Sequence, residues 1–211
     1  MKQRREEIMD AAVQIFARKG YYNTKIAEIV NLVGIAKGTF YLYFKSKKDL
    51  FIALIKKQRQ IINQGIDLEK IIGQSDDLKS FVKILIKEAF NIYGSNRDLT
   101  IVILRESVSV NKDFVAEFEL MDKERTERLR LAYEYLREQG YIDLTNDFEF
   151  FYYVFVGIIE SILLRKLIMN QEDFISQEVI NKTTNYIEKA LTIWFKIYIN
   201  SERSFKNGKL F

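Results

Sequence analysis

The stretch GIAKGTFYLYFKSKKDL, residues 34–50, places aromatic and basic side chains in close alternation. Its aromatic residues are Phe40, Tyr41, Tyr43 and Phe44, and its lysines are Lys37, Lys45, Lys47 and Lys48. A core helix does not accommodate the lysines, and a solvated helix does not accommodate the aromatic side chains. The mixture predicts a helix that packs on the protein with one face and contacts a polyanion with the other.

Side chains four positions apart share one stripe of a helix. Phe40 and Phe44 therefore form a stripe that we expect to face neighbouring helices, while Gly38 and Leu42 lie on the opposite side. A glycine costs a helix about 1 kcal/mol relative to alanine, so its place here indicates that another surface approaches closely. Double-stranded DNA fits, because a helix enters the major groove and a glycine lets its axis come near the base edges.

The outward face offers a different contact at each position. Thr39 can hydrogen-bond a base, and Lys37 can reach a guanine or a phosphate. Leu42 can touch a thymine methyl group. Tyr41 and Tyr43 carry hydroxyl groups that can bond phosphate while their rings pack on the protein.

Two further phosphate sites are expected at helix N-termini. Ser46 can cap a helix that begins there, with Asp49 three residues on in a variant of the capping box. The lysines beside this cap are Lys45, Lys47 and Lys48. Thr24 is expected to cap the preceding helix, so Thr24 and Lys25 form the other site.

Two helices must position this segment. Apolar side chains recur on one helical face from Ile8 to Phe16, and Gly20 ends that helix. A second apolar face runs from Ile26 to Val33, and Gly34 ends it about two residues before the next helix begins. Two short helices joined by a tight glycine turn make a helix-turn-helix unit.

Charge is uneven along the chain. Residues 1–50 carry ten basic and five acidic side chains, a net +5, whereas residues 51–211 carry a net −1. A basic end on a near-neutral body indicates a polyanionic partner at that end. The alternative interpretation is an ordinary solvated charged surface.

The segment from Arg4 to Ile61 resembles the DNA-binding domain of the TetR/AcrR (tetracycline-repressor) family of transcriptional regulators. The matching residues are Ala12, Phe16, Gly20 and Tyr21, then the run from Thr24 to Gly34, then K-G-T-F-Y-x-Y-F-x-S-K-x-x-L from Lys37 to Leu50. The resemblance implies that Gly38, Thr39, Tyr41 and Tyr43 lie at the DNA and that Lys47 binds its backbone. It also implies a homodimer.

The composition predicts an all-α fold, because the chain has no proline and only nine glycines among 211 residues. We expect about nine helices in two domains, a three-helix DNA-binding domain over residues 1–50 and a ligand-binding and dimerisation domain over 51–211. One helix from about Ser46 to Lys70 is expected to connect the domains. Further helices are expected near residues 77–93, 98–110, 112–139, 145–169 and 174–200.

The sequence argues against several function classes. It has no cysteine and no histidine, which removes the usual zinc ligands and the common nucleophile systems, so no metal, cofactor or catalytic residue is expected. An enzyme that relies on carboxylates alone remains a remote alternative. The longest uncharged run, Phe150–Ile159, is too short to span a bilayer, and no signal peptide is apparent, so a cytoplasmic protein without membrane contact is expected.

The last two helices are predicted to form the dimer interface. The helix from Asp147 is apolar nearly all the way round and needs burial on every side, and its Gly157 would allow a close neighbour. The last helix carries a stripe of 3.5-residue period, formed by Ile180, Thr184, Ile187, Leu191, Trp194 and Tyr198. The alternative is that both helices lie inside one subunit.

Residues 51–211 hold 22 of the 29 aromatic residues, which suggests a cavity for a small-molecule effector. We expect Phe118, Tyr152 and Phe155 in its wall and Arg105 or Glu160 at a polar end of the ligand; plain core packing is the alternative. The leading hypothesis is a dimeric repressor that binds a palindromic operator and is released by an apolar or amphipathic effector. The second is a helical small-molecule-binding or scaffold protein whose N-terminal unit contacts protein.

Overall fold

The computed structural model describes residues 2–107, 112–142, 147–172 and 175–206, and for residues 193–206 it describes the backbone only. Throughout these ranges the regular structure is helical, without a strand, so the all-α prediction is confirmed. The described helices include none that is long and apolar enough to cross a membrane.

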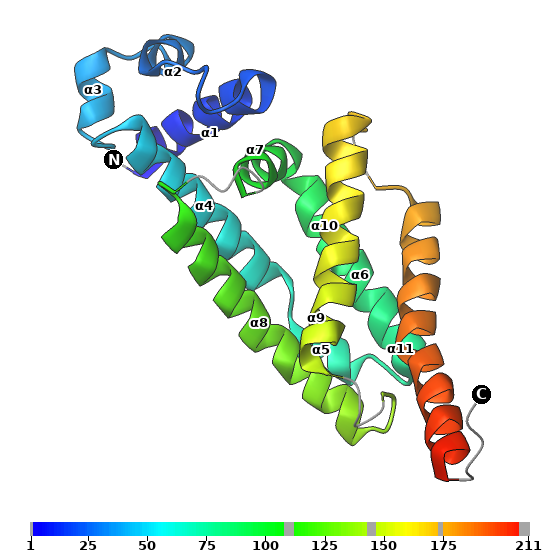
Figure 1. Ribbon diagram of the computed structural model, residues 1–211. Helices are drawn as coiled ribbons and strands as arrows, with labels where there is room; N and C mark the ends of the chain where they lie inside the picture. The colour runs from blue at the N-terminus through cyan, green and yellow to red at the C-terminus, as the bar shows by residue number, and fades with distance from the viewer. Residues whose placement is uncertain (1, 108–111, 143–146, 173–174, 207–211) are drawn as a thin grey trace.

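Three helices form the N-terminal end of the molecule: α1 (Lys2–Lys19), α2 (Ile26–Val33) and α3 (Lys37–Tyr41) (Figure 1). Gly34 ends α2 in the left-handed conformation, with a φ of 73° that a residue with a side chain adopts at a cost. The backbone N–H of Ile35 then donates to the carbonyl of Val30, which closes the turn. The predicted helix-turn-helix unit is present.

The helix α4 (Lys47–Gly65) leads from this unit into the body. Its cap is the predicted one, because the Ser46 hydroxyl accepts a hydrogen bond from the backbone N–H of Asp49 at 3.0 Å. The prediction of one unbroken helix to Lys70 is wrong. Ile66 is extended, and Asp67 caps a new helix, α5 (Leu68–Gly73), by accepting from the Lys70 N–H at 3.0 Å.

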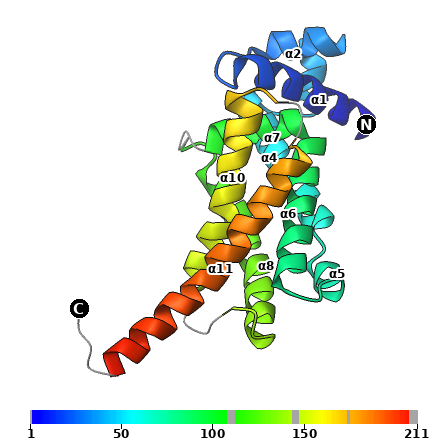
Figure 2. The same cartoon turned by 90° about the vertical axis from the view of Figure 1, so that its right-hand side faces the viewer.

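The body contains the remaining helices near the predicted positions. They are α6 (Leu78–Ser95), α7 (Arg97–Ser107), α8 (Val115–Glu138) and α11 (Gln177–Lys206), together with the consecutive segments α9 (Phe148–Tyr152), η1 (Tyr153–Gly157), α10 (Ile158–Leu163) and η2 (Leu164–Met169). The last four form one rod, here called the 148–169 helix, in which η1 and η2 are π-helical. Figures 1 and 2 show α8 running beside α4 and α11 packed along α6.

Buried apolar side chains form two clusters. The first contains side chains of α1, α2, α3 and α4, and also Leu99, Val102 and Ile103 of α7 and Phe114. The second joins α5, α6, α8, the 148–169 helix and α11. The core of the DNA-binding unit is therefore continuous with α7, and α7 lies between the two ends of the protein.

Within one subunit, the 148–169 helix is buried on one side only, since Phe150, Tyr153 and Met169 are exposed, Tyr153 to 58%. Burial of its other side by a second subunit, as the sequence predicts, stays a prediction. Ile187 and Leu191, expected at a dimer interface, are 0% and 2% exposed because their stripe packs on α6 of the same subunit. The side chains of Trp194 and Tyr198 lie outside the described residues.

Candidate DNA-binding face and effector pocket

The segment around α3 has the two faces that its sequence suggests. Phe40 and Phe44 are buried in the first core cluster, whereas Leu42 is 81% exposed. Gly38 is exposed as well, and a Cβ atom added there would meet nothing within 4 Å. A partner can therefore approach the α3 backbone at Gly38 without meeting a side chain of this chain.

The other residues expected at the DNA surround this open position. Lys37 and Tyr41 are exposed, and Thr39 and Tyr43 are half-buried. The Tyr41 ring packs edge-on against Phe40, with 5.4 Å between ring centroids. The Tyr41 side chain is also 48% exposed, so its ring packs on the protein while part of the side chain stays accessible to a phosphate.

Thr24 does not cap α2. Its side chain is 2% exposed, and its hydroxyl donates to the Gly20 carbonyl at 2.8 Å. The N-cap residue is Lys25, whose backbone N–H donates to the Glu28 carboxylate at 2.8 Å. Thr24 thus holds the turn between α1 and α2, while the exposed side chain of Lys25 can still meet a phosphate.

The structure gives Lys47 a different role from the expected phosphate contact. Its ammonium donates to the carbonyl oxygens of Tyr21 at 2.6 Å, Thr24 at 2.8 Å and Tyr22 at 3.3 Å. It also lies 4.4 Å from the centroid of the Tyr21 ring. Burial lowers the pKa of Lys47. These contacts fasten the start of α4 to the turn between α1 and α2.

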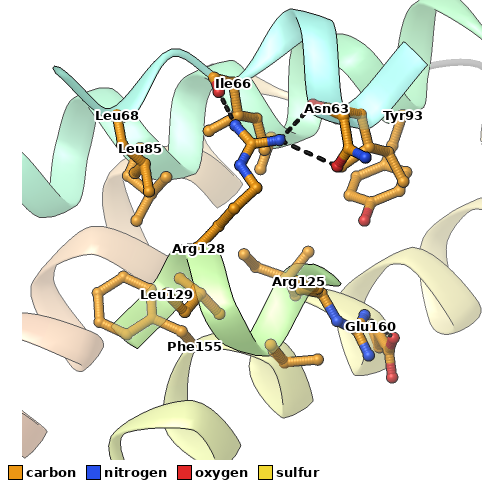
Figure 3. A pocket seen from close by; sticks show the side chains of 14 residues that line it. Asn63, Ile66, Leu68, Leu85, Tyr93, Arg125, Arg128, Leu129, Phe155 and Glu160 are labelled. Carbon is orange, nitrogen blue, oxygen red and sulfur yellow. Dashed lines mark hydrogen bonds and ion pairs between the residues drawn. The ribbon is translucent and has the colours of Figure 1, made fainter. Parts of the chain in front are cut away.

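Two adjoining chambers lie inside the body, of about 70 Å³ and about 270 Å³. The smaller, which we call the inner chamber, has mainly apolar walls from α4, α6, α8 and the 148–169 helix (Figure 3). The larger, the outer chamber, adds residues of α7. Both chambers share Ile62, Asn63, Tyr93, Arg125 and Glu160.

Three of the five residues expected in a pocket line these chambers. Phe155 lies in the inner chamber, Phe118 in the outer one, and Glu160 in both. Arg105 is elsewhere, because its guanidinium donates to the Ala17 carbonyl at 2.5 Å and so ties α7 to the end of α1. Tyr152 is not among the lining residues, but its hydroxyl accepts a hydrogen bond from Arg125, which lines both chambers.

Arg125 is the centre of a charged cluster between the chambers. Its guanidinium is 2.5 Å from Glu160 and 2.6 Å from Asp122, and its Nε donates to the Tyr152 hydroxyl at 3.1 Å. Burial alone would lower the pKa of Arg125, but the Glu160 carboxylate raises it above its ordinary value. Burial also raises the pKa of Tyr152 to about 12. The charge of Arg125 is thus neutralised by the carboxylates of Glu160 and Asp122, in largely apolar surroundings.

Five further residues line the chambers and were not expected from the sequence: Gln58, Asn63, Tyr93, Arg125 and Arg128. Arg125 and Arg128 lie in the run KERTERLR, which is typical of a solvated helix. Their spacing of three residues puts both on one helical face, and this was the signal available. Gln58 gave no signal, although its amide is buried and has no hydrogen-bond partner in the part of the chain described.

A helix-turn-helix unit with an open recognition face, joined to a helical body that contains a pocket, defines a class of DNA-binding regulators. Residues 8–54 match the family model described as bacterial regulatory proteins of the tetR family. Residues 8–54 thus form a DNA-binding domain of the TetR family of transcriptional regulators.

The fatty acid metabolism regulator protein of Bacillus subtilis (strain 168) is 36% identical over 106 residues. That match covers 48% of this chain and 53% of the relative, about half the length of either. The fatty acid degradation regulator FadR of Bacillus halodurans shares the fold, with a TM-score of 0.73 at 21% identity over 89% of this chain and 94% of that one. FadR of Bacillus subtilis, solved with stearoyl-CoA, also shares the fold, with a TM-score of 0.71 at 24% identity over 88% of this chain and 96% of that one.

Proposed function

We propose that this protein is a dimeric transcriptional repressor that releases its operator when an amphipathic effector fills the two chambers. The observation that carries the DNA-binding part is the open backbone at Gly38, opposite the buried Phe40 and Phe44. As a regulator and not an enzyme, the protein would act in the cytoplasm, where the DNA of a bacterium lies. The protein-contact alternative does not account for the excess positive charge of the first fifty residues.

The proposed DNA contacts keep most of the expected residues. Gly38, Thr39 and Leu42 would face the base edges, and Lys37, Tyr41, Tyr43 and Lys25 would meet phosphates. Lys47 and Thr24 are left out, because their polar groups already bond within the protein. The exposed Lys45 at the start of α4 is the better phosphate contact in that region.

The proposed dimer uses the exposed side of the 148–169 helix. Phe150, Tyr153, Gly157 and Ser161 are exposed along it at spacings of three and four residues, so they form one stripe. Gly157 would meet nothing within 4 Å if it carried a Cβ atom, which leaves room for a close approach by a partner helix. A two-fold dimer would place two recognition segments on successive major grooves, roughly 34 Å apart.

The proposed effector is a fatty-acyl compound. The helices α4, α6, α8 and the 148–169 helix line the inner chamber mainly with apolar side chains, which suits a hydrocarbon chain. FadR of Bacillus subtilis, which shares the fold, was solved with stearoyl-CoA, and a curated relative regulates fatty acid metabolism. These neighbours make long-chain acyl compounds the first to test.

The helix α4 would carry the signal, since it begins at the DNA-binding unit and lines both chambers with Ile62 and Asn63. An effector that prefers a different α4 position from the one that DNA prefers must weaken DNA binding, and DNA must weaken effector binding by the same factor.

The experiment is a titration of a fluorescent protein–operator complex with stearoyl-CoA, using free coenzyme A as the control. We expect release of the DNA by stearoyl-CoA only. If the compound binds the protein at saturation and operator affinity does not change, the proposed switch is refuted.

A further inference from the structure

Three arginines line the two chambers, and they differ in how their charge is neutralised. Arg59 is 3.4 Å from the Glu124 carboxylate, and Arg125 is 2.5 Å from Glu160. Arg128 has no carboxylate within ion-pair distance among the residues that the structure describes. It is therefore the pocket arginine whose charge is least compensated by direct contacts.

Arg128 instead binds the C-terminal end of α4 (Figure 3). Its guanidinium donates to the Ile66 carbonyl, to the Asn63 side-chain oxygen at 3.1 Å and to the Ile62 carbonyl at 3.4 Å. The last carbonyl groups of a helix lack partners within it, so a guanidinium is a natural cap for them. Arg128 thus fixes the end of α4 to α8 through three neutral acceptors, and we call this set of contacts the α4 clamp.

An anion would be a stronger partner for Arg128 than these neutral acceptors. A carboxylate or phosphate brings a full opposite charge and can accept two parallel N–H bonds from the planar guanidinium, whereas each neutral oxygen offers only a partial charge. The charged side chains that line the inner chamber are Arg125, Arg128 and Glu160. Arg125 is already paired with Glu160 and Asp122, so Arg128 is the lining arginine without a carboxylate partner among the described residues. The chamber beside Arg128 therefore favours a ligand that is anionic at one end and apolar along the rest.

The direction of approach follows from the charges on the other side of Arg128. The surface groove there is lined by Asp67 and Glu69, which would repel an anion. Among the residues that the structure describes, Glu160 is the one carboxylate that lines the inner chamber, and it is already paired with Arg125. An anionic head group would therefore meet Arg128 from the chamber, with its chain along the apolar walls.

We propose that Arg128 is the effector sensor, and that an anionic amphiphile opens the α4 clamp by taking the guanidinium from the α4 carbonyl groups. This inference rests on the proposed function, because it uses the same pocket and the same DNA response. Release of the clamp would free the far end of the helix whose first residue, Lys47, is fastened to the DNA-binding unit. The anion could be the carboxylate of a free fatty acid or a phosphate of an acyl-CoA.

The binding experiment compares three probes with the same twelve-carbon chain, below their micelle concentrations: dodecanoate, dodecanoyl-CoA and dodecanol. Calorimetry on the full-length protein should show an anionic probe bound at least about tenfold more tightly than dodecanol. Preference for dodecanoate identifies a carboxylate as the head group, and preference for dodecanoyl-CoA identifies the phosphates. Equal affinity for all three probes, or no binding of any, overturns the inference without using a variant.

Variants then test the residue. Arg128→Gln should lose the preference for the anionic probe, and Arg128→Lys should keep part of it, because lysine retains the charge but not the planar fork. The matched control is Lys123→Gln, which removes a positive charge from the exposed side of the same helix. If Arg128→Gln folds and keeps the wild-type preference, Arg128 is not the sensor.

The clamp itself has a separate readout. Without any ligand, Arg128→Gln should speed hydrogen exchange of the amides in residues 62–68 and lower operator affinity by about fivefold, whereas Lys123→Gln should do neither. Unchanged exchange at the end of α4 overturns the clamp. Failure of the proposed function and failure of the Arg128 inference give different results. If the wild-type protein does not bind its operator, the proposed function is refuted. If dodecanol and dodecanoate release the operator DNA equally well, only the inference about Arg128 is refuted.

Discussion

Gly38 weakens the helix that contains it and leaves that helix open to close approach by a partner. Its position is exposed with nothing nearby. The buried pair Phe40 and Phe44 on the other side holds the segment in place through the core instead. The segment is thus fixed by its inner face, and its outer face is free to serve a partner.

We predict that Gly38→Glu leaves the protein folded and lowers operator affinity by at least about a hundredfold. The new carboxylate would lie against the DNA, where charge repulsion and lost close contact both oppose binding. Fluorescence anisotropy measures the affinity, and circular dichroism measures folding. The control is Leu131→Glu, at an exposed apolar position on α8. Normal DNA binding by the folded Gly38 variant would mean that another face of the unit reads the DNA.

Lys47 illustrates the reverse case, a lysine that is expected at the DNA and serves the fold. We predict that Lys47→Met destabilises the protein by about 2 kcal/mol, because three carbonyl groups lose a charged donor. Chemical denaturation measures this change, with Lys45→Met as the control that should leave stability unchanged. A variant with wild-type stability and a salt slope of DNA binding reduced by about one unit would show that Lys47 is a phosphate contact after all.

At the scale of the elements, α4 and α7 connect the two ends of the protein. The start of α4 is held by Lys47, and its end is held by Arg128. The helix α7 lines the outer chamber with Ile103 and Leu104 and reaches the end of α1 through Arg105. A shift in the chamber walls therefore has two physical routes to the DNA-binding unit.

The 148–169 helix is the element on which dimer formation depends in this account. We predict that Tyr153→Arg gives a monomer in sedimentation velocity and lowers operator affinity by at least about tenfold, because a charge would be buried in the interface. Leu131→Arg places the same charge at an exposed position on α8 and should remain a dimer. If Tyr153→Arg is still a dimer, the interface lies on another face, and the outward side of α11 becomes the next one to test.

Most helices could be predicted from the sequence, because each depends on local periodicity and caps. Ser46 and Asp49 sufficed to locate the start of α4. The break between α4 and α5 was missed because Asp67 resembles an ordinary helix residue until its cap is seen. Ile187 and Leu191 were assigned to a dimer because an apolar stripe does not reveal whether it packs on its own subunit or on another.

At the scale of the whole molecule, the pocket could be predicted only in part. Its walls come from α4, α6, α7, α8 and the 148–169 helix, which are far apart in the sequence. Phe118, Phe155 and Glu160 were chosen for their type and do line it, whereas Arg105 was chosen for the same reason and does not. The contact of Arg128 with α4 joins residues 62 or more positions apart, and no local pattern encodes such a pair.

The most direct test of the central claim is fluorescence anisotropy of the purified protein with DNA from immediately upstream of its own gene, in excess nonspecific competitor and over a salt series. We predict binding that resists the competitor, saturates at two protomers per site and weakens steeply as salt rises. Absence of binding even at low salt would contradict the account and would favour a protein partner for the N-terminal unit.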